Sequence, residues 1–221
     1  MSTFSHRSAV LFMAFIAILA WMALGMQLNL MISNLKDAEL TNLQLTARFF
    51  SYFTILTNLL AAINLTFLLA FPVSGVARFF ARPSMQTAIA VYLVVVCVGY
   101  NLLLRDLWHP TGLQFWIDEL LHDVIPLLFL VYWLFFVLKG KLNTMHPISW
   151  LLFPVLYLLF ILMRGSVDGF YPYPFMHVEE IGYRAVLQNS GWLLLAFVIT
   201  SYFFVAIDKL LYRRKQRTVI T

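Results

Sequence analysis

Six long apolar stretches constrain this chain more than any other feature of its sequence. They cover approximately residues 8–28, 49–71, 85–104, 115–138, 148–163 and 186–207. A helix needs about 20 apolar residues to cross about 30 Å of hydrocarbon, because each residue advances it by about 1.5 Å. It also satisfies its own backbone hydrogen bonds, which an open sheet in lipid does not. We therefore predict an all-α membrane protein, a single domain over residues 1–221 that forms a bundle of six transmembrane helices.

The composition agrees with this prediction and excludes a soluble protein. Charged residues make up 11% of the chain and its mean hydropathy is +0.85, whereas soluble domains carry about 25% charged residues. The net charge of +5 does not indicate a nucleic-acid partner, because the basic residues lie at the ends of the apolar stretches and gather in the tail KLLYRRKQR. We expect an integral membrane protein. The sequence leaves the oligomeric state open.

Lys and Arg are distributed unequally between the two predicted sides of the membrane. One side carries Arg7, Arg78, Arg82, Lys139, Lys141, Lys209, Arg213, Arg214, Lys215 and Arg217. The other carries Lys36, Arg48, Arg105, Arg164 and Arg184, together with most of the acidic residues. Cytoplasmic segments hold the excess of Lys and Arg in membrane proteins. We therefore predict that both termini are cytoplasmic.

The first and the fifth stretches differ from an ordinary membrane span. The first follows Arg7 and resembles a signal peptide, but it is longer than a typical apolar core of one and no clear cleavage site ends it, so we retain it as a span. The fifth is short and carries Pro154 near its middle. That position predicts a kink or a locally thinner bilayer.

Polar residues within the second stretch form a stripe. The segment RFFSYFTILTNL begins it, and a helical spacing of about 100° per residue gathers its polar side chains within an arc of about 140°. The residues on this arc are Ser51, Thr54, Thr57, Asn58 and Asn64. Hydroxyl and amide groups in a membrane helix need a partner or a cavity. The alternative role is structural, since such groups also bond their own helix or a neighbouring one.

The fourth stretch, FWIDELLHDVIPLLFL, carries an ionisable stripe that is rarer in membranes. Asp118, Glu119, His122, Asp123 and Pro126 fall within a similar arc. Counted from the predicted outer surface, Thr54 and His122 both lie roughly 10 Å deep, so the hydroxyl and the imidazole are expected to meet. Asn101 and Arg105 end the third stretch on the same side, and Arg164 ends the fifth. The two arginines are placed to hold a carboxylate or phosphate, or else extend to the membrane surface.

At YFTILTNLL and LLHDVIPLL the sequence resembles the androgen-induced and androgen-dependent family of integral membrane threonine hydrolases. That family has a threonine in a Y-x-T-x-L context of an early span and a histidine, followed by a proline, in a later one. The resemblance implies Thr54 as nucleophile and His122 as base, with Thr57 as an alternative nucleophile one turn further on. The segments NLLLRDLWHPTG, Arg164–Gly165 and YPYPF look like a bacterial family of six-span proteins without an assigned function, and that likeness covers most of the chain.

The activity implied by this resemblance is hydrolysis of a fatty acyl lipid ester near the outer leaflet. The resemblance also implies an integral protein of a bacterial cytoplasmic membrane, with a membrane lipid or lipid-like ester as its partner and no cofactor. His122 would take the proton of Thr54, and Asn58 or Asn101 would donate to the developing oxyanion. Arg105 or Arg164 would bind an anionic part of the substrate. The acids Asp118, Glu119 and Asp123 would either orient the imidazole or belong to a different chemistry. YPYPF is either an aromatic anchor at the interface or a loop over a lipid portal.

Three other readings remain open from the sequence. A small transporter or lipid-binding protein would use the same histidine and carboxylates as a proton relay or a ligand site. A structural protein would use the polar residues to hold its helices together. A metal site at His109, His122 and His177 has no tight ligand spacing to support it, so we expect no metal.

Overall fold

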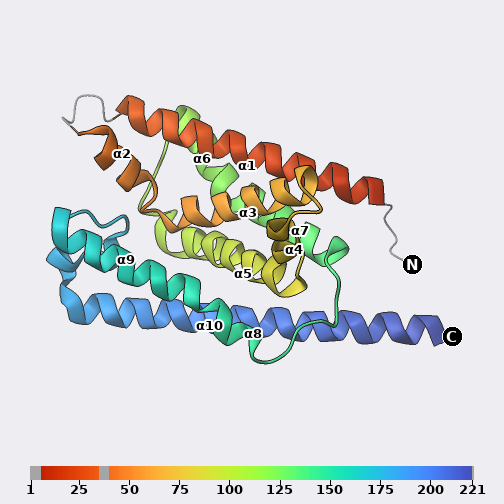
Figure 1. Ribbon diagram of the computed structural model, residues 1–221. Helices are drawn as coiled ribbons and strands as arrows, with labels where there is room; N and C mark the ends of the chain where they lie inside the picture. The colour runs from red at the N-terminus through yellow and green to blue at the C-terminus, as the bar shows by residue number, and fades with distance from the viewer. Residues whose placement is uncertain (1–5, 35–39, 221) are drawn as a thin grey trace.

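A computed structural model describes residues 6–34 and 40–220, and within these ranges the chain is helical with no strand. Six helical segments are long and apolar enough to cross a membrane, which confirms the prediction of an all-α fold with six helices of that length and polarity. The elements, shown in Figure 1, are α1 (His6–Asn34), α2 (Asn42–Phe49), α3 (Phe53–Ala70), α4 (Gly75–Phe80), α5 (Pro83–Gly99), η1 (Tyr100–Leu104), α6 (Gly112–Glu119), η2 (Leu120–Val124), α7 (Ile125–Phe136), α8 (His146–Trp150), α9 (Leu152–Asp168), η3 (Pro174–Met176) and α10 (Val178–Ile220).

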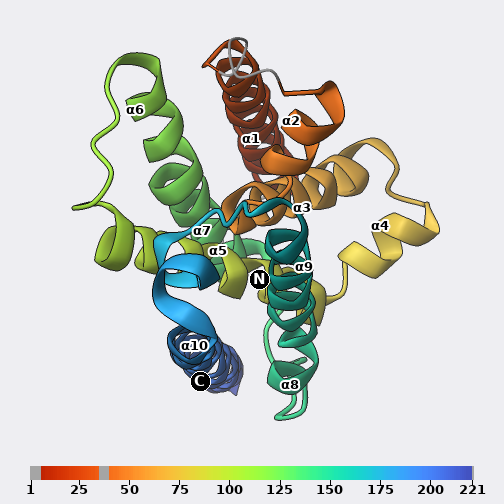
Figure 2. The same ribbon diagram turned by 90° about the vertical axis from the view of Figure 1, so that its left-hand side faces the viewer.

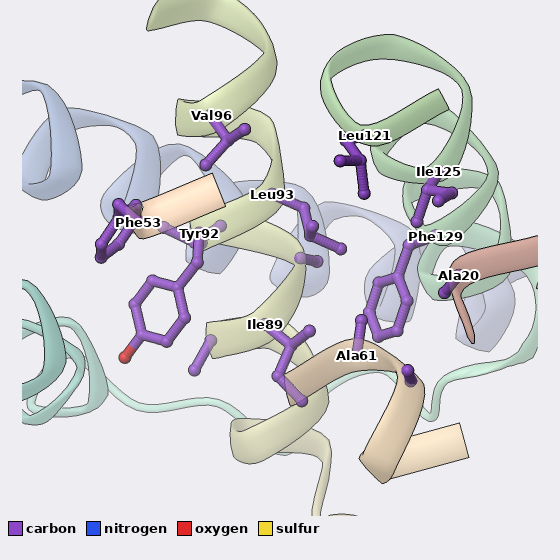
Figure 3. Close-up of a cluster of buried hydrophobic side chains, with 14 of the residues drawn as sticks. Ala20, Phe53, Ala61, Ile89, Tyr92, Leu93, Val96, Leu121, Ile125 and Phe129 are labelled. Carbon is purple, nitrogen blue, oxygen red and sulfur yellow. The ribbon is translucent and has the colours of Figure 1, made fainter. Parts of the chain in front are cut away.

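Helix α5 lies at the centre of the bundle. It contacts α3, α7 and α10, while α1 covers α3 and α7 on one side and α9 lies beside α10 on the other (Figures 1 and 2). Figure 3 shows Ile89 and Leu93 of α5 among Ala61 of α3 and Phe129 of α7, and all four side chains are buried. Alanines at the contact let the backbones of neighbouring helices approach closely, which stabilises helix pairs in lipid.

The second span differs from its prediction at the outer end. Instead of one helix from residue 49, α2 ends at Phe49 and α3 begins at Phe53, so Ser51 lies between two helices and not on the stripe of α3. The break is held by other parts of the chain. The Tyr157 hydroxyl donates to the Ser51 carbonyl at 2.8 Å, and the Arg164 guanidinium donates to the Ser51 hydroxyl.

The fifth span was predicted to be short, with Pro154 near its middle. It instead covers His146–Asp168, and its break lies at Leu151, so Pro154 occupies the first turn of α9. A proline lacks the N–H that would bond the carbonyl four residues earlier. Here the hydroxyl of Tyr92 donates to that carbonyl, on Trp150, at 2.7 Å. The proline is therefore accommodated without an unsatisfied carbonyl in the membrane.

Two membrane-spanning segments contain a π-helical turn, η1 directly after α5 and η2 between α6 and α7. Each turn inserts an extra residue into the i→i+4 pattern, so a uniform spacing of about 100° per residue does not hold through it. The contacts of η2 with α5 bring the two segments side by side. These turns carry Tyr100 and His122, which become part of the candidate site below.

Helix α10 is longer than a membrane crossing requires. Its apolar and basic part covers 40 residues, Val178–Arg217, which at about 1.5 Å per residue exceeds a hydrocarbon thickness of about 30 Å. Gly182 has φ 77°, a left-handed conformation that interrupts the helix near its start. The start of α1 and the end of α10 lie at the same end of the bundle, and α3 begins at the opposite end (Figure 1). That the termini face the cytoplasm stays a prediction.

Candidate functional site

The side chains of Thr54 and His122 meet inside the bundle. Thr54 is the second residue of α3, and His122 lies in the π-helical turn η2. Thr54 Oγ1 lies 3.2 Å from His122 Nε2, which is hydrogen-bonding distance. Both side chains line the same cavity. The equal depths deduced from the sequence thus correspond to a direct contact.

The tautomer of His122 follows from its second hydrogen bond. Nδ1 lies 2.9 Å from the carbonyl oxygen of Asp118, and a carbonyl only accepts. The neutral imidazole therefore carries its proton on Nδ1 and presents the lone pair of Nε2 to the Thr54 hydroxyl. The ring of Tyr100 stacks on the imidazole, with centroids 3.8 Å apart and planes 14° from parallel. The imidazole is thus fixed in position by a backbone carbonyl and an aromatic face.

The π-helical turn η2 also explains the position of Asn58. In η2 the N–H of Ile125 donates to the carbonyl of Leu120, so the carbonyl of Leu121 loses the partner that an α-helix would give it. The amide nitrogen of Asn58 donates to that carbonyl at 3.0 Å and to the carbonyl of Thr54 at 2.9 Å. Asn58 therefore joins α3 to η2, and both of its N–H groups are engaged by main-chain oxygens.

Thr57, the alternative nucleophile, lies in a different environment. Its hydroxyl donates to the carbonyl of Thr54 at 3.1 Å, and its side chain is fully buried. It does not line the cavity that Thr54 and His122 share. The geometry therefore favours Thr54.

The Asp118 carboxylate is buried among hydrogen-bond donors. Its two oxygens do not contact the imidazole. Its oxygens accept from Trp108 Nε1 at 2.7 Å, from Gln114 Nε2 at 3.0 Å and from the Tyr100 hydroxyl at 3.4 Å. Because Tyr100 stacks on His122, the carboxylate positions one of the groups that hold the imidazole. Only the main-chain carbonyl of Asp118 contacts the ring directly.

Glu119 and Asp123 face Arg105. The guanidinium bonds Glu119 at 2.8 Å and also bonds Asp123, and Asn101 donates to Asp123 at 2.7 Å. This cluster joins η1 to α6 and η2 beside the site. The amide of Asn101 is thereby engaged outside the cavity.

Arg164 lies on the α2–α3 side of the molecule. It donates to the Ser51 hydroxyl, bonds Asp168 at 2.9 Å and lies 4.6 Å over the ring of Phe170. It does not line the cavity, and neither does Arg105. The structure thus brings Thr54, His122 and Asp118 together and places the two arginines in ion pairs around them.

The cavity at the Thr54–His122 pair has a volume of about 100 Å³. Its wall is mostly apolar and is completed by the loop after α9, through Tyr173, Phe175 and Met176. A few water molecules fit a space of this size, since one needs about 15 Å³ or more. The cavity therefore offers a hydroxyl and an imidazole to an apolar space with room for water.

Tyr173 is a site residue that the sequence reasoning did not identify. Its hydroxyl accepts from the N–H of Phe53 at 3.0 Å and lies within hydrogen-bonding reach of the main chain and side chain of Thr54. Helix α3 has no side-chain cap from its own N-cap residue, Tyr52, so Tyr173 takes that place. The sequence predicts YPYPF to be either an aromatic anchor or a loop over a lipid portal, but sequence spacing does not reveal which of its hydroxyls turns inward.

Among the described residues, no group of three or more His, Cys, Asp or Glu side chains is placed to hold a metal ion. His177 pairs with Glu180 at 3.6 Å and is not joined to His122 in such a group. In comparisons with known proteins, no family model, no curated protein and no solved structure matches the chain.

Proposed function

We propose that this protein is an integral membrane hydrolase of fatty acyl esters, with Thr54 as nucleophile and His122 as base. The observation that carries the proposal is the 3.2 Å contact between Thr54 Oγ1 and His122 Nε2 at the wall of an apolar cavity. A neutral hydroxyl needs an adjacent base to act as a nucleophile near pH 7. The resemblance of YFTILTNLL and LLHDVIPLL to the membrane threonine hydrolases supports the same assignment.

The first half of the reaction transfers the acyl group to the protein. Thr54 Oγ1 attacks the ester carbonyl carbon as its proton moves to His122 Nε2. The tetrahedral intermediate then breaks its bond to the alcohol oxygen, and His122 returns the proton to that oxygen. The products of this half are a free alcohol and a threonyl ester on Thr54.

Charge on the carbonyl oxygen is stabilised by donors beside Thr54. The N–H groups of the first turn of α3 have no intrahelical acceptor, although that of Phe53 is bound to the Tyr173 hydroxyl, and the positive end of the helix dipole lies there. The Tyr173 hydroxyl, at 3.0 Å from Phe53 N, is the side-chain donor placed at the same point. These groups replace Asn58 and Asn101 as our candidate donors to the oxyanion, because the side-chain amides of both asparagines are already bound to other oxygens.

The second half of the reaction uses water. A water molecule in the cavity gives a proton to His122 Nε2 and attacks the threonyl ester. The bond from the acyl carbon to Thr54 Oγ1 breaks, the proton returns to Thr54, and the fatty acid leaves. One ester and one water have then become one alcohol and one acid.

The surroundings of the site support this substrate and this side of the membrane. The cavity wall is mostly apolar and lies among membrane-spanning helices, which favours an acyl chain over a polar ester. Thr54 lies in the first turn of α3, and α3 begins at the end of the bundle opposite the termini (Figure 1). With the basic termini in the cytoplasm of a bacterial cell, the site faces the outer leaflet of the cytoplasmic membrane.

The test is release of fatty acid from a long-chain acyl ester by the purified protein in detergent. We expect Thr54→Val and His122→Ala each to lower the rate about 10³-fold or more, and Thr54→Ser to keep part of it. Thr57→Val is the matched control and should retain activity. Binding of the ester without release of acid would instead make the protein a lipid-binding protein, and equal loss in Thr57→Val would remove the assignment of Thr54.

A further inference from the structure

A second hollow lies next to the catalytic cavity, between the α5–η1 segment and α10. Its volume is about 630 Å³, within the range of sites that enclose one small ligand. Residues from α5, η1, the loop before α10 and α10 itself form its wall, and none of the lining residues is charged. We call this hollow the lateral groove.

The lateral groove faces the side of the bundle. Leu102, Leu107 and Trp192 on its wall are 77%, 69% and 71% exposed. In a chain with six membrane-spanning helices, large apolar side chains exposed at this level are in contact with lipid. The groove therefore opens toward the hydrocarbon of the membrane.

The lateral groove and the catalytic cavity share part of their walls. Five residues line both: Val95, Gly99, Leu103, Phe175 and Leu193. Gly99 has helical backbone angles, and a Cβ added there would meet no atom within 4 Å. The missing side chain leaves the junction between the two spaces open.

We propose that the lateral groove binds a single acyl chain of a membrane lipid ester, which reaches Thr54 sideways from the bilayer between η1 and α10. The occupant is apolar, because no charge lines the groove and the amide nitrogen of Asn189 is already bound to the Phe175 carbonyl at 3.0 Å. Transfer from lipid into the groove gains little hydrophobic energy, since both are apolar. Selection thus depends on shape, which favours one unbranched chain. Binding of the chain in the groove does not depend on the proposed function. Hydrolysis of the bound ester at Thr54 does rest on it.

The direct test is photolabelling, which needs no turnover. A long-chain acyl ester with a photoreactive diazirine in its chain is placed in vesicles with the Thr54→Ala protein. We expect cross-links at η1 and α10, including Leu103 and Leu193, and their loss in Gly99→Phe. Gly25→Phe in α1 is the matched control, because Gly25 also has no atom within 4 Å of an added Cβ. Cross-links that persist in Gly99→Phe, or that lie on other helices, would overturn the proposal.

A second variant covers the case in which Gly99→Phe does not fold. Ala196→Trp fills the groove from α10, and should also remove the cross-links. In the protein that retains Thr54, Ala196→Trp, which lines the groove and not the Thr54–His122 cavity, should lower hydrolysis of the long-chain ester at least about tenfold relative to hydrolysis of p-nitrophenyl acetate. An equal loss of hydrolysis for the two esters would contradict binding of the long acyl chain in the lateral groove. Groove labelling that depends on Gly99, in a protein that hydrolyses neither ester, would leave this proposal standing and refute the hydrolase.

Discussion

The ring of Tyr171 occupies the space that the missing side chain of Gly165 leaves on α9. A Cβ built on Gly165 would collide with ring carbons of Tyr171, which is itself buried. This contact fixes the loop after α9, and the same loop supplies Tyr173 and Phe175 to the wall of the cavity at Thr54 and His122. A glycine far from the chemistry therefore controls the position of a proposed catalytic hydroxyl.

The first prediction concerns this contact. Gly165→Ala should displace Tyr171 and lower the free energy of unfolding by about 1–3 kcal/mol, the usual range for overpacking. Ester hydrolysis should fall by up to about 10²-fold, because a shift of about 1 Å in a positioning group has that effect. Thermal unfolding and the hydrolysis rate measure the two effects. Gly25→Ala, where an added Cβ meets nothing within 4 Å in the interior of α1, should lower neither. Wild-type stability and rate in Gly165→Ala would refute the role of the contact.

The second prediction concerns the hydroxyl of Tyr173. Tyr173→Phe keeps the ring and removes the proposed donor to the oxyanion, so kcat should fall about 10²–10³-fold with little change in KM. Tyr92→Phe is the matched control, because it removes a buried hydroxyl bound to the Trp150 carbonyl and does not line the cavity. It should cost about 1 kcal/mol of stability and leave kcat unchanged. Equal kcat values in the two variants would exclude Tyr173 as a donor.

The third prediction separates this site from a Ser-His-Asp triad. In such triads the carboxylate bonds the imidazole, and changing Asp to Asn lowers kcat about 10⁴-fold. Here the main-chain carbonyl of Asp118 holds His122 Nδ1, so Asp118→Asn should lower kcat less than about tenfold. It should lower the free energy of unfolding by about 1–3 kcal/mol, because a new N–H group would face the donors Trp108 and Gln114. A loss of activity as large as that of His122→Ala would show that the carboxylate itself acts on the imidazole.

The fourth prediction concerns stability at the end of the bundle opposite the site. Lys139, beyond α7, donates to the carbonyls of Trp133 and Val137, and burial lowers its pKa to about 8 although Asp208 opposes the shift. The ordinary pKa of 10.5 applies in the unfolded chain, which therefore binds more protons between pH 8 and pH 10.5. Stability contributed by this group should rise with pH across that window.

Thermal unfolding of the wild type and of Lys139→Met, at several pH values from 7 to about 10.5, tests this expectation. Subtraction of the two curves removes the groups that both proteins share. The wild type should gain stability relative to the variant as the pH rises above 8. Parallel curves would mean that Lys139 titrates normally in the folded protein.

The sequence was sufficient to predict six helices long enough to span a membrane and the proximity of Thr54 to His122. Both follow from apolar length and helical rise, which are local properties of each helix. The predicted proximity holds despite the π-helical turn, because His122 lies within η2 and not beyond it. The role of the pair in catalysis stays a prediction.

The features that sequence periodicity missed depend on partners far along the chain. The break at Ser51 is held by Tyr157 and Arg164, more than 100 residues away. Pro154 fits because Tyr92 replaces its missing N–H as donor to the Trp150 carbonyl. The hydroxyl of Tyr173 is likewise placed by a loop contact and not by any spacing. These are tertiary contacts, and no helical repeat encodes them.

The most direct measurement is the site of covalent modification by a fluorophosphonate probe, which reacts with activated hydroxyl nucleophiles. The purified protein is labelled in detergent, and the modified peptide is identified by mass spectrometry. We predict an adduct on Thr54 that is absent from Thr54→Ala and His122→Ala and retained in Thr57→Val. An adduct that survives Thr54→Ala, or one that maps to Thr57, would contradict the assignment of Thr54 and His122 as nucleophile and base.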